Sequence, residues 1–466
     1  MKCLPLVIAL SMLLTVHIQA TEQTEQFGRF GTVHLYYSGT TYSNVVIFIS
    51  GDGGWNLGVV DMARQLSAMN TLVVGIDIIH YLKGLEAADE KCSYPSGDFE
   101  LLSKYVQKKM GLPVYHVPIL VGYSSGATLA YALAAQAPHG TFKAALSLGF
   151  CPDLPLTKPF CSGSGVTFEP GPKGKGYNFL PKKDLSIPWV VFQGTIDQVC
   201  PIAVARQFVD KTGNTRMIEL PKVGHGFSVE KNWLPQFQQI FSELAREEPA
   251  AVSKQQQTVD VSGLPLVEVA PEGQQQDVVA ILLTGDGGWA GLDRDIAGAL
   301  SARGISVVGW NSLQYYWKAR TPEEAALDLD KIIAHYSTAW KKKTVICIGY
   351  SFGADVLPFL INRLSQESGN KVKLVAYLGL SPSADFEFHV SDWIGGEDSK
   401  TARPVLPEIG KIRGKPMLYF YGSDEKNSIA DKLNPAAITC IPLAGGHHLG
   451  GHYDAVVNAI VARIGK

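Results

Sequence analysis

Residues 121–127 have the sequence VGYSSGA, and residues 348–354 have the sequence IGYSFGA. Each stretch contains the pattern Gly-x-Ser-x-Gly and joins an apolar run to a helix-forming one. Glycines flank the serine in such a pattern because the chain turns too tightly for side chains there, and the turn lifts the serine hydroxyl above the sheet. A single match is a weak signal, since a glycine-rich strand-to-helix turn also produces it. Two matches in the same context predict two nucleophiles, Ser124 and Ser351.

Two further phrases flank this motif in the same order in both halves of the chain. ISGDGGW (49–55) and LTGDGGW (283–289) precede it, and PKVGHGF (221–227) and LAGGHHL (443–449) follow it. Six β-rich runs also correspond pairwise and alternate with helical stretches, which predicts a parallel sheet covered by helices on both faces. The runs are VVIFIS, LVVGID, PILVGYS, AALSLGF, WVVFQG and MIELP in the first half, and VVAILLT, ISVVGW, TVICIGYS, LVAYLGL, MLYFYG and ITCIPL in the second. We therefore expect an α/β protein with two tandem α/β-hydrolase domains.

The domain boundaries follow from a polar stretch between the two copies. Residues 247–257 (EEPAAVSKQQQ) contain proline and show no periodicity, as is typical of a linker. We expect domain 1 at residues 21–247, the linker at 248–257 and domain 2 at 258–466. The clearest helix start lies in domain 2, where Thr321 and Glu324 predict a capping box with proline at the first helical position.

Both copies also contain an acid and a histidine in the order that this fold requires. A serine hydroxyl is a poor nucleophile until a neighbouring imidazole accepts its proton. An aspartate follows the fifth β-rich run of each copy, 73 residues after the serine, and a histidine follows the sixth run, 28 or 23 residues later. A turn cap would explain one such aspartate, but equal spacing in both copies favours a catalytic role. The predicted triads are Ser124, Asp197 and His225, and Ser351, Asp424 and His447.

The GDGGW loops predict the remaining part of each site, an oxyanion hole made of two backbone N–H groups. The predicted donors are Asp52 and Ser125 in the first copy, and Asp286 and Phe352 in the second. Trp289 is predicted to line the substrate site; the alternative is that it only packs a helix on the sheet.

Neither a metal nor a cofactor is predicted. The cluster His447, His448 and His452 raises a metal site as an alternative, but no carboxylate or thiol lies at ligand spacing and the triad already uses one histidine. The GDGG loops are not followed by Lys-Ser/Thr, which a phosphate-binding loop of that kind needs.

Charge and the N-terminus restrict the setting in which the protein works. Lys plus Arg (41) nearly balances Asp plus Glu (43), so no overall field attracts nucleic acid.

Residues 1–20 predict a cleavable secretory signal, with a lysine at position 2 and an apolar run from Leu4 to Val16. A membrane anchor is the weaker alternative, since the run is shorter than the about 20 residues that span a bilayer. We expect a periplasmic mature chain without a transmembrane segment.

The cysteines of the mature chain fall into two groups. Four lie in loop-like stretches of domain 1 and predict two disulfides in an oxidising compartment, with three pairings open. Those four are Cys92, Cys151, Cys161 and Cys200. Cys347 and Cys440 lie in apolar runs and are predicted to be buried thiols.

The phrases VVAILLTGDGGW, IGYSFGADVLPF and LAGGHHLGGHY closely resemble the VirJ/AcvB family of secreted bacterial virulence-associated proteins. The resemblance covers essentially the whole mature chain and is most specific over residues 278–460. It implies hydrolysis of aminoacyl-phosphatidylglycerol at the outer face of the inner membrane, releasing an amino acid such as lysine or alanine. It also implies that Ser351, Asp424 and His447 are the catalytic set. The expected partner is thus an aminoacylated phospholipid at a membrane surface, and the sequence leaves protein partners open.

An acidic segment in domain 2 matches the cationic amino group of such a substrate. Residues 381–399 contain five acids and no Lys or Arg, and Asp385, Glu387 and Asp392 are predicted to contact the substrate. A solvated surface segment is the alternative. Two other functions remain open: a periplasmic binding or scaffolding protein with relic hydrolase motifs, and a general esterase or thioesterase for soluble substrates.

Overall fold

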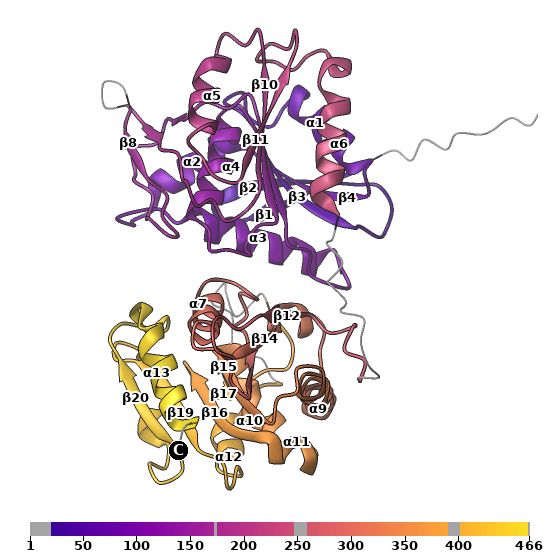
Figure 1. The fold of residues 1–466 in the computed structure, drawn as a ribbon. Helices are drawn as coiled ribbons and strands as arrows, with labels where there is room; N and C mark the ends of the chain where they lie inside the picture. Colours follow the sequence, from indigo (N-terminus) through magenta and orange to yellow (C-terminus); the bar gives the residue numbers. More distant parts are fainter. Residues whose placement is uncertain (1–19, 172–174, 247–258, 390–400, 465–466) are drawn as a thin grey trace, which may run out of the picture.

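The computed structural model describes residues 20–171, 175–246, 259–389 and 401–464. Two large sheets lie in it, one in the N-terminal half of the chain and one in the C-terminal half (Figure 1). The predicted linker and all but the last residue of the predicted signal segment lie outside the described residues. The exact domain boundaries therefore stay a prediction.

The two sheets share one strand order. It is β1-β2-β4-β3-β5-β6-β10-β11 in the N-terminal half and β12-β14-β13-β15-β16-β19-β20 in the C-terminal half. The six parallel strands of each sheet coincide with the six β-rich runs that the sequence predicts. In the first sheet they are β3 (Asn44–Ile49), β4 (Thr71–Ile76), β5 (Ile119–Tyr123), β6 (Ala144–Leu148), β10 (Trp189–Gly194) and β11 (Thr215–Leu220). In the second they are β13 (Val278–Leu283), β14 (Ser306–Trp310), β15 (Thr344–Tyr350), β16 (Val372–Leu378), β19 (Met417–Gly422) and β20 (Thr439–Leu443).

Antiparallel strands extend one edge of each sheet and were not predicted. They are β1 (Thr21–Phe27) and β2 (Gly31–Tyr37) in the first sheet and β12 (Leu266–Val269) in the second. Strand β1 has the polar sequence TEQTEQF and no buried residue, so it lacks the apolar signal of the central strands. Small antiparallel sheets follow the fourth parallel strand of each half: β7 (Asp153–Leu154), β8 (Phe168–Pro170) and β9 (Tyr177–Phe179), and β17 (Ser383–Ala384) with β18 (Arg403–Pro404).

Helices cover both faces of each sheet. One face packs against α1 (Leu57–Ser67) and α6 (Leu234–Ala245), or against α7 (Gly291–Ser301) and α13 (Tyr453–Ile464). The other face packs against α2 (Ile78–Ala87), α3 (Pro95–Lys109), α4 (Ser125–Gln136) and α5 (Ile202–Val209), or against α8 (Ser312–Tyr315), α9 (Pro322–Ala339), α10 (Phe352–Ile361) and α12 (Val405–Ile409). Helix α11 (Gln366–Lys371) precedes β16, and α9 begins at the predicted capping box of Thr321 and Glu324. Among the described helices, none combines the length and apolar character that crossing a bilayer requires.

Each sheet separates two layers of apolar core. In β3, Val45, Ile47 and Ile49 pack on one face, while Val46 and Phe48 pack on the other. This alternation is the strand period, and burial on both faces explains why the central strands are almost wholly apolar.

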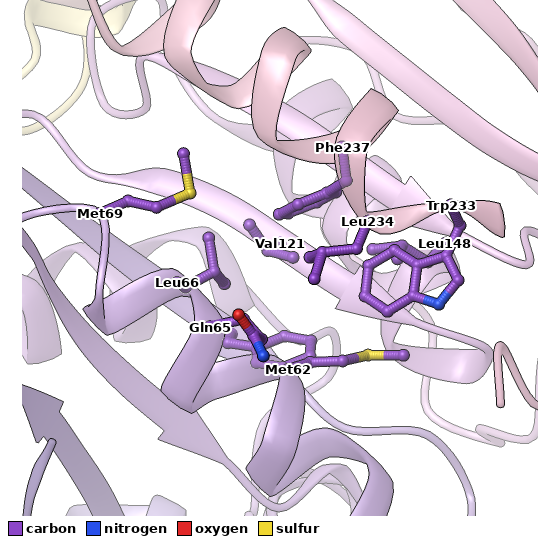
Figure 2. Close-up of a pocket in the computed structure, with 10 residues that line it drawn as sticks. Met62, Gln65, Leu66, Met69, Val121, Leu148, Trp233, Leu234 and Phe237 are labelled. Carbon is purple, nitrogen blue, oxygen red and sulfur yellow. The ribbon is translucent and has the colours of Figure 1, made fainter. Parts of the chain in front are cut away.

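A small apolar cavity lies between α1 and α6 in the N-terminal half (Figure 2). Leu66, Trp233 and Phe237 are among the side chains that line it. Its volume of about 10 Å³ holds roughly one water-sized sphere. It is a packing gap in the core and cannot hold a substrate.

Two disulfides connect loops of the N-terminal half, as the sequence predicts. Cys92 pairs with Cys161, and Cys151 pairs with Cys200. In the C-terminal half, Cys347 is a buried thiol and Cys440 is half-buried. The disulfides therefore constrain only one of the two copies.

Candidate active sites

Both predicted nucleophiles lie on a strand-to-helix turn with an unusual backbone conformation. Ser124 joins β5 to α4 with φ 56° and ψ −124°, and Ser351 joins β15 to α10 with φ 49° and ψ −119°. A non-glycine residue with positive φ is strained, and such strain persists only where the surrounding structure holds it. The same rare conformation in both copies indicates a nucleophile elbow.

The glycines of the motif allow backbone segments to approach each other closely. A Cβ on Gly122 would lie 2.0 Å from the Gly126 oxygen, and one on Gly126 would lie 2.3 Å from the Ile49 oxygen. In the second copy, a Cβ on Gly353 would lie 2.4 Å from the Leu283 oxygen. No side chain fits at these positions, so the glycines are a steric requirement of the elbow.

The first triad is assembled as predicted. The Nε2 atom of His225 lies 2.9 Å from the Ser124 hydroxyl oxygen, and its Nδ1 atom lies 2.9 Å from the Asp197 carboxylate. The carboxylate is fully buried and also accepts hydrogen bonds from the N–H groups of Val199 and Cys200. These bonds fix Asp197, which in turn orients the imidazole toward the serine.

The second triad contains a different acid from the predicted one. The Nε2 atom of His447 lies 2.9 Å from the Ser351 hydroxyl oxygen, but its Nδ1 atom lies 2.5 Å from the Glu425 carboxylate. The Asp424 carboxylate instead accepts a hydrogen bond from Ser423. Burial raises the pKa of Glu425, but the hydrogen bond and charge of His447 outweigh it and hold the pKa below its ordinary value. The predicted placement of Asp424 beside His447 was therefore wrong, because Glu425 occupies that position.

The error came from counting residues from the serine. Counted from the end of the preceding strand, Asp197 is the third residue after Gly194 and Glu425 is the third after Gly422. The backbone agrees, since the N–H of each acid donates to the carbonyl oxygen of that glycine. Segments between the serine and the acid differ in length between the copies, so an equal count of 73 was a coincidence. Strand ends were the signal that could have identified Glu425.

The GDGG loops lie beside the nucleophiles. A Cβ on Gly51 would lie 2.9 Å from the Ser124 Cβ, and one on Gly285 would lie 3.5 Å from the Ser351 Cβ. Phe352 is the first residue of α10, where an N–H group has no partner within the helix. The predicted oxyanion donors Asp286 and Phe352, like Asp52 and Ser125 in the first copy, thus belong to the two segments that flank each serine. Their role stays a prediction.

The structure favours the packing interpretation of Trp289. A Cβ on Gly309 of β14 would lie 2.1 Å from its indole, and Trp55 has the same relation to Gly75 of β4. Trp289 also packs with the apolar core on the α7 and α13 face. Both tryptophans therefore cover a strand glycine, which explains their repeat in the sequence, and the predicted substrate contact of Trp289 is not supported.

The acidic segment is engaged in protein contacts where the structure describes it. Asp385 accepts from the N–H of Phe386 and lies 3.4 Å from His389, and Glu387 forms a 3.1 Å ion pair with Lys108 of the N-terminal half. These partners already satisfy both carboxylates, so the structure does not support their predicted role as substrate contacts. Asp392 lies outside the described residues.

A buried carboxyl that the sequence analysis missed lies next to the second nucleophile. Asp355 is in the first turn of α10, where Thr128 stands in α4, and its carboxylate accepts from the Ser381 N–H at 2.6 Å. Burial raises the pKa of Asp355 well above its ordinary value, and the negative charges of Asp286 and Glu425 add to this shift. The second site therefore concentrates carboxyl groups.

The two sites also differ in their surroundings. A cavity of about 490 Å³ opens beside Asp52 in the first site, lined by α2 side chains that include Ile79 and Leu82. In the second site Phe352 replaces Ser125, and its ring packs 5.0 Å from that of Tyr316. His448 follows His447 in the chain, and its Nδ1 atom lies 2.9 Å from the Tyr350 hydroxyl oxygen.

Comparison with known proteins identifies similar sequences and structures. A family model described as "Bacterial virulence protein (VirJ)" matches residues 43–146 and 277–466, together more than half of the chain. Among curated proteins, no sequence matches significantly.

Solved structures resemble single copies of the fold. An esterase domain from a Rhodothermus marinus protein is 16% identical, with a TM-score of 0.34, and the match covers 49% of this chain and 98% of that one. A serine hydrolase homologue from Coxiella burnetii is 16% identical, with a TM-score of 0.30, covering 48% and 96%. An α/β serine hydrolase from Xanthomonas campestris is 15% identical, with a TM-score of 0.32, covering 50% and 97%.

Proposed function

We propose that this chain, which belongs to the VirJ family of bacterial virulence proteins, is a serine esterase. Its proposed reaction is hydrolysis of the aminoacyl ester of aminoacyl-phosphatidylglycerol. The observation that carries the proposal is the geometry of the second site, where one imidazole lies 2.9 Å from the Ser351 oxygen and 2.5 Å from the Glu425 carboxylate. A serine, a base and an orienting acid in this order form the machinery of acyl transfer.

The reaction follows from this geometry. The Ser351 oxygen attacks the ester carbonyl carbon while His447 Nε2 takes the hydroxyl proton, and Glu425 stabilises the resulting imidazolium. The N–H groups of Asp286 and Phe352 stabilise the oxyanion of the tetrahedral intermediate. Its collapse breaks the ester C–O bond, and His447 protonates the departing glycerol oxygen. A water activated by the same imidazole then hydrolyses the acyl-enzyme, releases the amino acid and restores the serine.

The charge of the second site supports a cationic acyl group. Burial raises the pKa of Asp355 well above its ordinary value, and the negative charges of Asp286 and Glu425 repel its ionised form further. A bound ammonium group relieves this repulsion, because a neighbouring opposite charge favours the ionised carboxylates. An α-amino ester carries such a group next to the scissile carbonyl. In the first site Thr128 replaces Asp355, so the same preference is not expected there.

Two observations support the second site as the main one and the periplasm as the compartment. The family match includes Ser351, Glu425 and His447, whereas in the first copy it ends at residue 146, before Asp197 and His225. Two disulfides in the N-terminal half suit an oxidising compartment.

The test is to incubate purified protein with vesicles that contain lysyl- or alanyl-phosphatidylglycerol and to measure the released amino acid. Vesicles of plain phosphatidylglycerol, assayed for released fatty acid, test for a phospholipase instead. We expect amino acid release that depends on Ser351, with no loss of fatty acid. Release of fatty acid, or no Ser351-dependent release of amino acid, would contradict the proposal.

A further inference from the structure

The N-terminal half packs on the active-site edge of the C-terminal half. Helix α3 lies along the boundary between the two halves (Figure 1). Lys108 of α3 donates to the Trp317 carbonyl oxygen and pairs with Glu387, while the Trp317 indole donates to the Leu112 carbonyl oxygen. An apolar cluster seals this contact and consists of Tyr115, Leu313, Trp317 and Phe388, with Val117 against it.

The contacted segments of the C-terminal half follow β13, β14 and β16 in the chain, and the one after β14 includes helix α8. Carboxyl ends of parallel strands meet at one edge of a sheet, and Ser351 stands at the carboxyl end of β15, between β13 and β16 in the sheet. The N-terminal half thus covers the edge that carries the second site. The cover is one-sided, because the His447 side chain remains 38% exposed.

One side chain of α3 reaches the oxyanion loop itself. Lys104 is fully buried, and its ammonium group lies 3.3 Å from the Asp286 carbonyl oxygen and 2.9 Å from the Glu100 carboxylate. The ring of Phe388 lies 5.6 Å away. A buried ion pair costs desolvation energy that an apolar pair avoids, so its presence at this contact is not explained by stability alone.

We propose that Lys104 is a positioning residue for the second active site, supplied by the other half of the chain. This inference rests on the proposed function, because it concerns the esterase reaction at Ser351. By binding the Asp286 carbonyl oxygen, Lys104 keeps that oxygen turned toward α3 and away from the developing oxyanion. Gly287 follows, and a glycine alone would leave this peptide free to rotate. The proposed oxyanion donor is the Asp286 N–H, which lies in the peptide unit before this one. Both peptide units share the Asp286 Cα atom, so fixing the carbonyl group also restricts the N–H group.

The charge of Lys104 acts in the same direction. An ammonium group in a water-excluded contact next to the oxyanion loop attracts negative charge that forms there, and low dielectric strengthens the effect. The second site is therefore complete only when the two halves are docked. In the first site the corresponding loop residue, Asp52, instead borders an open cavity of about 490 Å³.

The test uses the full chain with Ser124→Ala, so that turnover reports the second site. Lys104→Met should lower kcat for p-nitrophenyl butyrate and alanyl-phosphatidylglycerol by about 10–100-fold, less than loss of an oxyanion donor itself, with KM nearly unchanged. Lys104→Arg should recover most of kcat. The double variant Glu100→Gln/Lys104→Met removes the unpaired carboxylate and should stay as slow as Lys104→Met. Lys108→Met is the matched control, because it weakens the same contact without touching the loop, and its kcat should stay near that of the parent.

The outcomes separate two failures. If the Ser124→Ala parent neither turns over ester nor reacts with a fluorophosphonate at Ser351, the proposed function is wrong and the inference falls with it. If the parent is active and Lys104→Met keeps its kcat, or Lys108→Met loses as much as Lys104→Met, only the positioning role is overturned.

Discussion

The two halves hold the same three-part machinery and the same GDGG loop on the same strand order, yet several surroundings of the two sites differ. The first site has a buried Asp197, two disulfides in its loops and an open cavity beside Asp52. The second has Glu425, the additional carboxyl of Asp355 and a cover formed by α3. A nucleophile elbow can therefore be kept in both copies of a fold while different loops give each copy its own substrate environment. The following experiments test how far the two sites differ in activity, in the acid of the triad, in charge and in stability.

The largest expected effect separates the two nucleophiles. Ser351→Ala should lower hydrolysis of alanyl-phosphatidylglycerol by about 10⁶-fold, because the triad acts as a unit. Ser124→Ala should leave that activity nearly intact. Single-turnover release of alanine from vesicles is the measurement. Survival of activity in Ser351→Ala with loss in Ser124→Ala would reverse the assignment.

The next effect distinguishes the two neighbouring acids of the second site. Glu425→Gln should lower kcat by about 10⁴-fold, since the imidazole loses the acid that sets its tautomer and stabilises its charge. Asp424→Asn should leave kcat almost unchanged, because this side chain contacts Ser423 instead. Steady-state kinetics in the Ser124→Ala background measure both variants. A larger loss in Asp424→Asn would show that the acid counted from the serine was correct.

A smaller effect tests the difference in charge. Asp355→Asn keeps an acceptor for the Ser381 N–H but removes the carboxyl group that a bound ammonium group would ionise. A hydrogen bond to a charged group is worth about 1.5–3 kcal/mol, so kcat/KM for an alanyl ester should fall about 10–100-fold. The N-acetylated ester, which lacks the ammonium group, should lose much less. Asp385→Asn is the control and should affect both esters equally. Equal losses for the two esters in Asp355→Asn would contradict the prediction and show that another group contacts the ammonium.

The smallest effect concerns stability and pH. Asp293 is the third residue of α7, and the equivalent position in α1 of the first half is occupied by Val59. Burial holds the pKa of Asp293 well above its ordinary value of 3.8. Between the ordinary and the raised pKa the folded state binds a proton that the unfolded state has released, so stability falls as pH rises. Asp293→Asn removes this titration while keeping an acceptor for the Gly285 N–H.

We therefore expect Asp293→Asn to stabilise the C-terminal half by about 1–3 kcal/mol at pH 7 and to have little effect below the ordinary pKa. Hydrogen exchange of β13 and β15 amides across this pH range measures the effect in one half only. An equal gain at pH 3 and pH 7 would show that titration of Asp293 is not its cause.

Much of this protein could be inferred from local sequence. The central strands are buried on both faces, so their apolar runs are unmistakable, and the elbow glycines are demanded by backbone contact within a few residues. Strand ends in a parallel sheet share one edge, and this brings the predicted residues together in each half. They are Ser124, Asp197 and His225 in the first site and Ser351 and His447 in the second. The number of disulfides also followed from composition and context alone.

What only the tertiary structure decided depends on distances between segments that are remote in the chain. The choice of Glu425 over Asp424 depends on where β19 ends, and the pairing of four cysteines depends on which loops meet. Lys104 lies 182 positions before Asp286, and no local pattern marks it. Its role arises from the docking of two halves whose interface has no period in the sequence. Strand and elbow patterns are set by neighbours along the chain, whereas the surroundings of each site are set by neighbours in space.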